Sequence, residues 1–245
     1  MRRFIVSIGA AAGPILAIDT STRGTSVALY RDGLIAEYSW QSRDDQTREL
    51  IPAIQGLLSR QQVELKSLSG VAVALGPGSF NGLRVGVSTA KALALPLRLP
   101  VIGIGTLEAS AYQYAGVGLP LRPVLNAGRG QINTALFVGT PESWRQIEEP
   151  ESVTLEGLIA RIREPQLVCG EIEKGWAAEL MHHVGDLVRI LPAASWMRRA
   201  GFLAELGWRR LSAGEVDDVV TLQPIYLRKP AITRPRRQFD MEECR

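Results

Sequence analysis

The sequence contains few of the residues on which metal and hydrolytic chemistry usually depends. Of its 245 residues only two are cysteines and two are histidines, and aromatic residues make up 6%. Cys169 ends a short apolar run and Cys244 is the penultimate residue, so neither a disulfide framework nor a thiolate metal site is indicated. This cysteine usage is typical of the reducing cytoplasm, and we therefore expect a cytoplasmic protein.

The two histidines also argue against a metal centre. His182 and His183 are adjacent, so on a helix they point to different faces and cannot form an i, i+4 ligand pair. The sequence has no His-Glu-x-x-His motif and no Gly-x-Ser-x-Gly motif. A metal hydrolase or a serine hydrolase would lack its central groups, and the sequence predicts neither a metal site nor catalytic residues.

Long hydrophobic runs are missing as well. Residues 1–12 begin with two arginines and an apolar stretch that resembles a signal peptide, but Gly13 and Pro14 interrupt it and a core strand follows at once. We expect residues 1–14 to be an unstructured extension or to reflect an upstream start. No segment reaches the roughly 20 apolar residues that cross a bilayer, so no membrane association is expected.

The composition is that of a folded protein. Hydrophobic residues make up 46% and charged residues 22%, which is enough for a packed core. The net charge of +3 and the pI of 9.1 allow a weak attraction to RNA without requiring one. The length predicts one large domain or two small ones.

Hydrophobic periodicity in the first half predicts the order β-β-β-α-β-α-β-α. The Asp32-Gly33 pair is a strong hairpin signal between the second and third strands. Three hairpin-linked strands followed by crossover helices predict a mixed sheet with helices on its faces. This is the ribonuclease-H-like order that actin, sugar kinases and heat-shock proteins repeat, so we expect an α/β, actin-like, two-lobed fold. The expected strands are 15–19, 25–30, 34–40, 71–75 and 101–104, and the expected helices are 47–58, 82–95 and 106–114.

The second half has weaker patterns. A hairpin is expected over 124–138, followed by a polar connection that contains Pro141 and Pro150. A helix over 155–163, two short strands over 166–169 and 187–191, and a helix from an N-cap at Ser195 to Leu211 follow. The predicted division is an extension over 1–14, an N-terminal lobe over 15–106, a C-terminal lobe over 107–222 and an extended basic tail over 223–245.

A glycine-rich turn between a strand and a helix is the most distinctive segment. Gly76, Gly78 and Ser79 precede the helix N-terminus, where backbone and helix dipole favour an anion, and Asp19 ends the first strand. These four residues are the candidate nucleotide pocket. The turn matches neither a P-loop nor a dinucleotide fingerprint. A tight turn capped by Ser79, and an Asp19 that caps its own polar turn, explain the same residues.

The helix after this turn carries a row of small side chains at every fourth position, Gly82, Gly86, Ala90 and Ala94. Such a row lets another helix approach closely. It packs either against the chain's own sheet or, as we expect, against a partner. The partner reading requires that the chain's own fold leaves this row uncovered.

Several segments of the sequence resemble the TsaB family, the non-catalytic partner subunits of the bacterial machinery that makes threonylcarbamoyl-adenosine in tRNA. The resemblance covers residues 15 to 228 and is most specific in the glycine-rich segment. The matching segments are Ile15-Leu-Ala-Ile-Asp-Thr-Ser21, the Asp32-Gly33 hairpin, Gly76-Pro-Gly-Ser-Phe-Asn-Gly-Leu-Arg84, Gly103-Ile-Gly-Thr-Leu107 and Pro224-Ile-Tyr-Leu-Arg228.

The resemblance implies a heterodimer with TsaD, the related metal-carrying subunit that transfers threonylcarbamoyl to the tRNA adenosine beside the anticodon. It also implies an ATPase subunit, TsaE, in the assembly, no cofactor of the chain's own, and a nucleotide where subunits meet. The tRNA is reached through the complex. A homodimer of the chain alone and a contact between tail and tRNA are left open. The implied partner surface comprises Leu50, Ile54, Leu57, Leu58, Gly82, Arg84, Gly86, Ala90 and Ala94.

The sequence departs from the family pattern at the expected cleft. Gln46 stands where many members have His, Asn81 replaces the usual Thr, and Asn126 and Gly128 replace Asp and Arg. These changes put a ligand role at the cleft in doubt.

Two other functions compete with that of a scaffold subunit. A stand-alone actin-fold ATPase or phosphotransferase would use Asp19, and a peptidase is disfavoured because no nucleophile–base pair is present.

Overall fold

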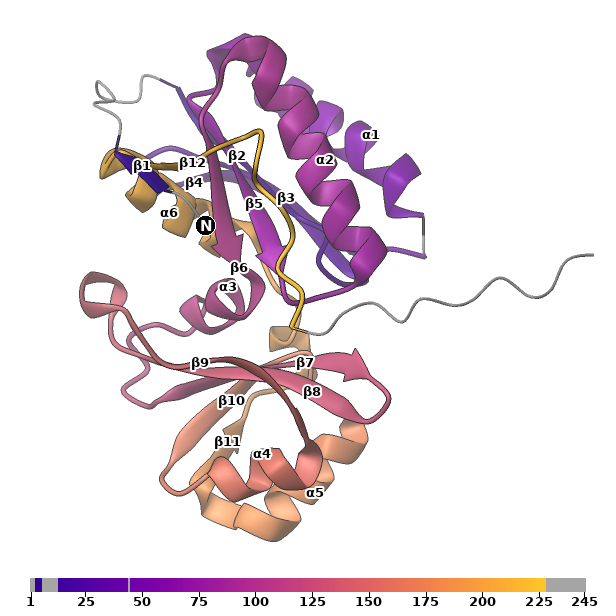
Figure 1. Ribbon diagram of the computed structural model, residues 1–245, viewed down its shortest axis with the longest axis vertical. Helices are drawn as coiled ribbons and strands as arrows, with labels where there is room; N and C mark the ends of the chain where they lie inside the picture. The colour runs from indigo at the N-terminus through magenta and orange to yellow at the C-terminus, as the bar shows by residue number, and fades with distance from the viewer. Residues whose placement is uncertain (1–2, 6–12, 44, 228–245) are drawn as a thin grey trace, which may run out of the picture.

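The computed structural model describes residues 3–5, 13–43 and 45–227, which form two lobes stacked end to end (Figure 1). The first lobe contains a seven-stranded sheet in the order β1-β12-β6-β5-β2-β3-β4, and the second a five-stranded sheet in the order β11-β10-β7-β8-β9. Among the residues that the structure describes, none of the helices combines the length and hydrophobicity that crossing a membrane requires.

The first sheet is built around strands that are buried on both faces. The apolar run Ile15–Asp19 forms an interior strand, paired antiparallel with β3 and parallel with β5. Helices α1 and α2 cover one face, and α6 covers the other. The bounds are β2 (Ile15–Asp19), β3 (Gly24–Tyr30), β4 (Leu34–Gln41), β5 (Gly70–Gly76), β6 (Val101–Gly105), α1 (Gln46–Arg60), α2 (Phe80–Leu97) and α6 (Ala200–Ser212).

The second sheet repeats the strand order of the first. In each sheet two antiparallel pairings join three consecutive strands, and two parallel strands extend the first of them on its other side. Helix α3 (Thr106–Tyr112) lies between the sheets (Figure 1). This duplicated order confirms the predicted two-lobed, actin-like fold. The bounds are β7 (Leu121–Gly128), β8 (Gln131–Val138), β9 (Arg145–Thr154), β10 (Gln166–Gly170), β11 (Val188–Ile190), α4 (Leu155–Arg161) and α5 (Lys174–Val184).

The lobe boundaries differ from the prediction at both ends of the chain. Helix α6 packs on β2, β3 and β5, so residues after about 200 return to the first lobe instead of completing a C-terminal lobe over 107–222. Strand β12 (Glu215–Asp217) pairs with β6 and with β1 (Arg3–Ile5). Part of the expected unstructured extension is therefore a strand. The apolar face of α6 needs a sheet to bury it, and the first sheet has a free face.

The structure also differs from the prediction at four places in the second half. The expected polar connection contains the edge strand β9. Its Pro150 and its glutamates obscure the alternation of apolar and polar residues by which a strand is recognised in the sequence. Helix α5 was not expected, and Ser195 ends a short 3-10 turn instead of capping the next helix, which begins at Ala200. Residues 223–227 return to the first lobe, where the Ile225 amide donates to Leu75 O. The rest of the predicted tail, 228–245, lies outside the described residues.

The row of small side chains on α2 faces the chain's own sheet. A Cβ on Gly82 would lie 2.1 Å from Thr20 O, and one on Gly86 would lie 2.3 Å from Thr20 Oγ1. Ala90 and Ala94 are fully buried. The expectation of an uncovered row is wrong, because the small residues let α2 approach the end of β2. Leu50, Ile54, Leu57 and Leu58 are core residues as well, and of the nine predicted interface residues only Arg84 is exposed.

Candidate functional site

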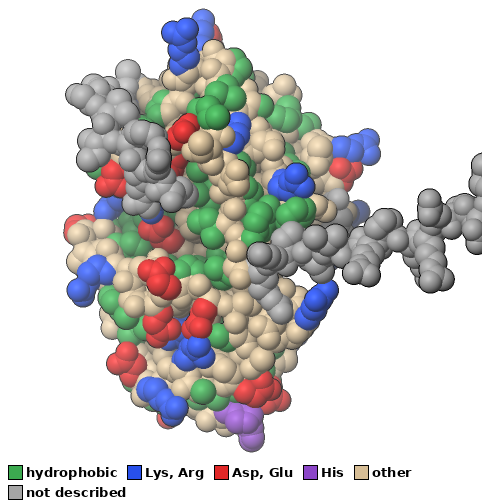
Figure 2. Space-filling view, viewed as in Figure 1, with side chains coloured by type: hydrophobic (Ala, Val, Ile, Leu, Met, Phe, Trp, Pro, Cys, Tyr) green, Lys and Arg blue, Asp and Glu red, His purple; other side chains and the backbone are tan. Residues whose placement is uncertain are grey.

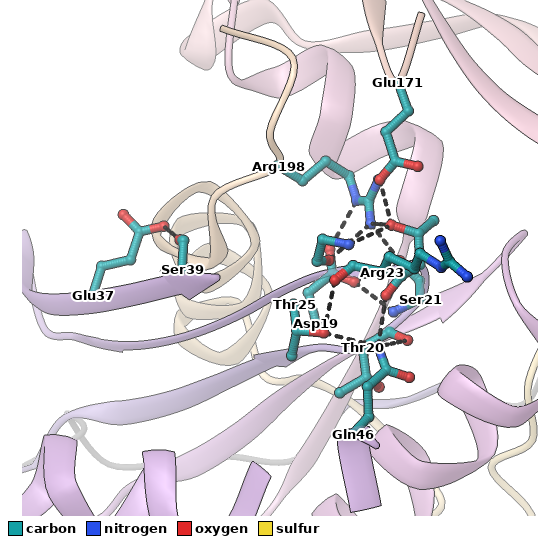
Figure 3. A network of polar contacts seen from close by, with 12 residues as sticks. Asp19, Thr20, Ser21, Arg23, Thr25, Glu37, Ser39, Gln46, Glu171 and Arg198 are labelled. Carbon is teal, nitrogen blue, oxygen red and sulfur yellow. Dashed lines mark hydrogen bonds and ion pairs between the residues drawn. The ribbon is translucent and has the colours of Figure 1, made fainter. Parts of the chain in front are cut away.

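A buried arginine joins the two lobes at the carboxyl end of β2 (Figure 3). Arg198 Nε lies 3.0 Å from Asp19 Oδ2, and its Nη1 lies 2.7 Å from Oε1 of Glu171, which follows β10 in the second lobe. Arg198 Nη2 donates to the hydroxyls of Ser21 (3.1 Å) and Thr22 (2.8 Å). One guanidinium therefore binds two carboxylates and two hydroxyls.

The charge of this arginine is strongly stabilised. Burial alone favours its neutral form, but the carboxylates of Asp19 and Glu171 outweigh burial and raise the pKa of Arg198 above its ordinary value. The side chains of Arg198 and Asp19 are each 2% exposed, whereas that of Glu171 is 33% exposed. Arg198 and Asp19 thus form a desolvated ion pair, with Glu171 at its solvent side.

Both oxygens of the Asp19 carboxylate already accept hydrogen bonds from the chain's own groups. Its Oδ2 accepts from Arg198, and its Oδ1 accepts from the backbone amide of Ser21 at 2.9 Å and from the Ser21 hydroxyl at 2.5 Å. Its placement supports the predicted capping role in the turn. Because Arg198 already balances its charge and its side chain is only 2% exposed, this carboxylate does not fit a site for a magnesium-bound nucleotide.

The glycines of the strand-to-helix turn approach the chain's own backbone. A Cβ on Gly78 would lie 2.2 Å from Ser21 O, and one on Gly76 would lie 2.5 Å from Ile225 O. The amide of Ser79 donates to Ser21 O at 2.6 Å, and its hydroxyl accepts from Gly82 N, which confirms the predicted N-cap. The close packing of this turn is explained without a phosphate.

A cavity of about 1220 Å³ opens between the lobes beside this network. It brings together two of the four candidate nucleotide residues, Gly78 and Ser79, whereas Asp19 and Gly76 are not on its wall. The positions that depart from the family pattern also line it. The remaining wall includes Thr22, Arg23, Gln46, Phe80, Asn81, Asn126, Gly128, Arg129, Asn133, Glu171, Trp196 and Tyr226.

Two of the altered positions have partners of their own. Gln46 Nε2 donates to Thr22 O at 2.6 Å and to Thr25 Oγ1 at 2.8 Å, so it ties the start of α1 to the turn after β2. Asn126 donates to Glu173 and accepts from the amide of Gly128. These amides therefore stabilise the walls of the cavity.

No sequence pattern identifies Arg198 or Glu171 as site residues. Arg198 is 179 positions from Asp19, and no local pattern distinguishes it from the arginine beside it.

Within the described ranges there is no group of three or more His, Cys, Asp or Glu side chains that could hold a metal ion. His182 and His183 lie in the last turn of α5, at the far end of the second lobe.

Comparison with known proteins places this architecture in a family. The family model described as "TsaD: tRNA N6-adenosine threonylcarbamoyltransferase" matches residues 41–233. The tRNA threonylcarbamoyladenosine biosynthesis protein TsaB of Bacillus subtilis is 33% identical over 218 residues, which cover 87% of this chain and 93% of the relative. The chain belongs to the TsaB family. The Escherichia coli member is 31% identical over 226 residues, covering 87% of this chain and 94% of its own length.

Two further similarities fit this assignment. A Pseudomonas aeruginosa structure, described as an uncharacterized protein with similarity to peptidase YEAZ, has a TM-score of 0.76 at 23% identity and covers 88% of this chain and all of its own. It shows that the fold is shared. A tRNA N6-adenosine threonylcarbamoyltransferase of Geobacter sulfurreducens is 38% identical over 112 residues, which cover 39% of this TsaB-family chain and 33% of that enzyme.

Proposed function

We propose that this TsaB-family chain is the non-catalytic subunit that binds and activates a TsaD threonylcarbamoyltransferase acting on the tRNA adenosine beside the anticodon. The observation that carries the non-catalytic role is the buried pair between Asp19 and Arg198, 3.0 Å apart. Arg198 thereby neutralises the Asp19 carboxylate, the group that could otherwise hold a metal-bound phosphate. The lobes are tied together through Glu171, so the chain is suited to act as a rigid support.

The partner surface in this proposal is the outward face of α1 and α2. The small-residue row no longer supports it, because that row is buried. The two helices contact each other and present apolar side chains to solvent, including Ile51 on α1 (40% exposed) and Leu95 on α2 (51% exposed). Hydrophobic side chains occur in small groups on the face that α2 presents (Figure 2). Exposed apolar groups of this kind are typical of protein interfaces.

The remaining members of the assembly follow from the same proposal. TsaE joins the TsaD heterodimer, and the tRNA is bound through the complex. A nucleotide lies at a subunit junction, since the N-terminal ends of α1 and α2 border the cavity. Without TsaD, two copies of the chain pair through the same exposed face.

Co-elution in size-exclusion chromatography tests the pairing. Wild-type chain and a TsaD protein are expected to elute as one complex, and Ile51→Glu is expected to abolish the complex without changing thermal unfolding. Ile147→Glu is the matched control, because Ile147 is 53% exposed but lies on β9 of the second lobe. Pairing of Ile51→Glu at wild-type strength would exclude this surface, and no pairing of the wild type would exclude the function.

The alternative, a stand-alone ATPase, is not favoured because the Asp19 carboxylate is paired with the Arg198 guanidinium. Calorimetry of the isolated chain with ATP and Mg²⁺ tests it. We expect no magnesium-dependent heat. Such a heat, if it disappeared in Asp19→Ala, would support the ATPase and contradict the proposal.

A further inference from the structure

The C-terminal part of the described chain is anchored beside the interlobe cavity. It runs past α2 toward the second lobe (Figure 1), and the amide of Ile225 donates to Leu75 O at 2.7 Å. The Tyr226 ring packs on Phe80, with 5.2 Å between the ring centroids, and Leu227 lines the cavity. The residues that follow Leu227 therefore start from a defined place between the lobes.

The sequence after this anchor holds the excess positive charge of the chain. Residues 1–227 contain 22 of the 28 basic residues and 22 of the 25 acidic residues, so their formal charges cancel. Residues 228–239, called here the arginine-rich segment, contain four arginines, one lysine and no acidic residue. The five cations are Arg228, Lys229, Arg234, Arg236 and Arg237. A neutral pair of lobes thus carries a strongly basic segment at one place.

Many arginines of the two lobes are balanced by carboxylates, in contrast to this segment. Those in ion pairs include Arg122, Arg161, Arg198, Arg199, Arg209 and Arg210. The arginine-rich segment contains no carboxylate of its own that could balance its charges. Its cations are therefore suited to a polyanion outside the chain.

Two exposed arginines extend the positive charge around the anchor. Arg84 is exposed on α2, and its guanidinium lies 5.0 Å from the centroid of the Phe80 ring on which Tyr226 packs. Arg129 is exposed at the tip of the β7–β8 hairpin and lines the same cavity as Leu227. A polyanion that binds the arginine-rich segment thus meets cations of both lobes as well.

The composition of the segment favours RNA over a membrane surface. Arginine binds phosphate through two parallel hydrogen bonds, and a run of cations gains affinity for RNA by releasing its counterions. The only large apolar residues in the segment are Ile232 and Phe239, and Pro230 and Pro235 oppose a continuous helix. A basic amphipathic helix, the usual membrane-binding element, is therefore not encoded.

We propose that the arginine-rich segment is an RNA-binding element that holds the phosphate backbone of tRNA directly, in addition to the contacts that the complex makes. Twelve residues span at most about 40 Å, so a segment that starts beside the cavity can reach RNA held by a partner subunit. The proposal rests on the proposed function only for the choice of tRNA, because attraction to phosphates is independent of sequence.

Fluorescence anisotropy of a labelled, unmodified tRNA transcript, titrated with the full-length chain alone, tests this element. Each phosphate contact contributes about 0.7 to 0.9 to the slope of log affinity against log salt concentration, so five contacts predict a slope of about −3.5 to −4.5. The affinity should therefore fall about ten- to twentyfold when the salt concentration rises from about 100 to 200 mM. Absence of binding, or a slope near zero, would overturn the proposal.

Variants connect the signal to the segment. Glutamine at all five cations should remove most of the slope and weaken binding by at least about tenfold at about 100 mM salt. Lysine at the four arginines keeps the charges and should bind like the wild type. The matched control replaces four exposed arginines and one exposed lysine of the lobes with glutamine, so that both variants lose the same charge. Its positions are Arg60, Arg145, Arg163, Lys174 and Arg189.

Equal losses in the glutamine variant and in the control would show that net charge, and not the segment, attracts the RNA, and would overturn the proposal. Tighter binding to phosphatidylglycerol vesicles than to tRNA would do the same, because it would assign the segment to a membrane surface. The glutamine variant should still co-elute with TsaD, and loss of that complex would assign the segment to the protein interface instead. A wild-type chain that binds tRNA through the segment without pairing with TsaD would contradict the proposed function and support this element.

Discussion

Arg198 and Asp19 are 179 positions apart in the chain, yet their side chains form a 3.0 Å ion pair that is almost completely shielded from water. Asp19 ends β2, an interior strand of the first sheet, and Arg198 lies on the segment that returns from the second lobe. Glu171 extends the pair into the second lobe. The geometry of the cleft therefore depends on one guanidinium.

Replacing Arg198 with Met should destabilise the fold by about 3–5 kcal/mol, because the buried carboxylate of Asp19 loses its counter-charge. Urea unfolding followed by circular dichroism measures the change. The adjacent Arg199, whose side chain is 49% exposed, is the control, and Arg199→Met should cost less than about 1 kcal/mol. Equal effects of the two variants would contradict the assigned role of Arg198.

Gly86→Leu should lower the stability of the isolated chain, because a Cβ at this position would lie 2.3 Å from Thr20 Oγ1. Overpacking of this kind costs about 1–3 kcal/mol. Ser88→Leu, on the exposed side of the same helix, should leave the melting temperature nearly unchanged. If Gly86→Leu melted like the wild type, the burial of the small-residue row would be in error.

Gln46→Leu should destabilise the chain by about 1–3 kcal/mol, since the change leaves the carbonyl of Thr22 and the hydroxyl of Thr25 without their donor. The exposed neighbour Thr47 provides the matched control, Thr47→Leu. Chemical denaturation of both variants decides the question, and indistinguishable midpoints would show that Gln46 does not anchor α1.

The pair between Arg122 and Glu148 predicts an acid-sensitive contribution to stability. The hydrogen bond from Arg122 holds the pKa of Glu148 below its ordinary value of 4.5. A folded pKa that is lower than the unfolded one stabilises the fold at neutral pH, and this stabilisation is lost as the pH falls through the folded value. Glu148→Gln should therefore be less stable than the wild type at pH 7, and the difference should shrink below pH 4.5. Glu149→Gln, at the exposed neighbouring position, is the matched control.

Much of the fold could be predicted because it is encoded locally. The apolar run Ile15–Asp19, the Asp32-Gly33 hairpin and the Ser79 cap each specify their element within a few residues. Strand β9 escaped prediction because an edge strand tolerates Pro150 and exposed glutamates. The place of α6 could not be predicted, because an apolar helix face does not reveal which sheet will cover it.

The candidate site was less predictable for a related reason. Periodicity identified the row that contains Gly82 and Gly86, but a row of small residues fits a sheet and a partner helix equally well. Arg198 gave no signal, since its role arises only when three distant segments meet. The Ser79 turn was recognised, but the cavity that it borders is also lined by Asn133 of β8 and by Tyr226 of the C-terminal segment.

Because the chain returns to the first lobe at its end, the first lobe is completed later in synthesis than the second. The five strands of the second sheet lie between Leu121 and Ile190, so all of them are synthesised before α6. The first sheet, although translated earlier, keeps one apolar face uncovered until residues 200–217 emerge. A polypeptide that is released after truncation before Ala200 should therefore hold all strands of the second sheet beside an incomplete first lobe, and a chaperone that recognises exposed apolar sheets should bind the older part of the polypeptide.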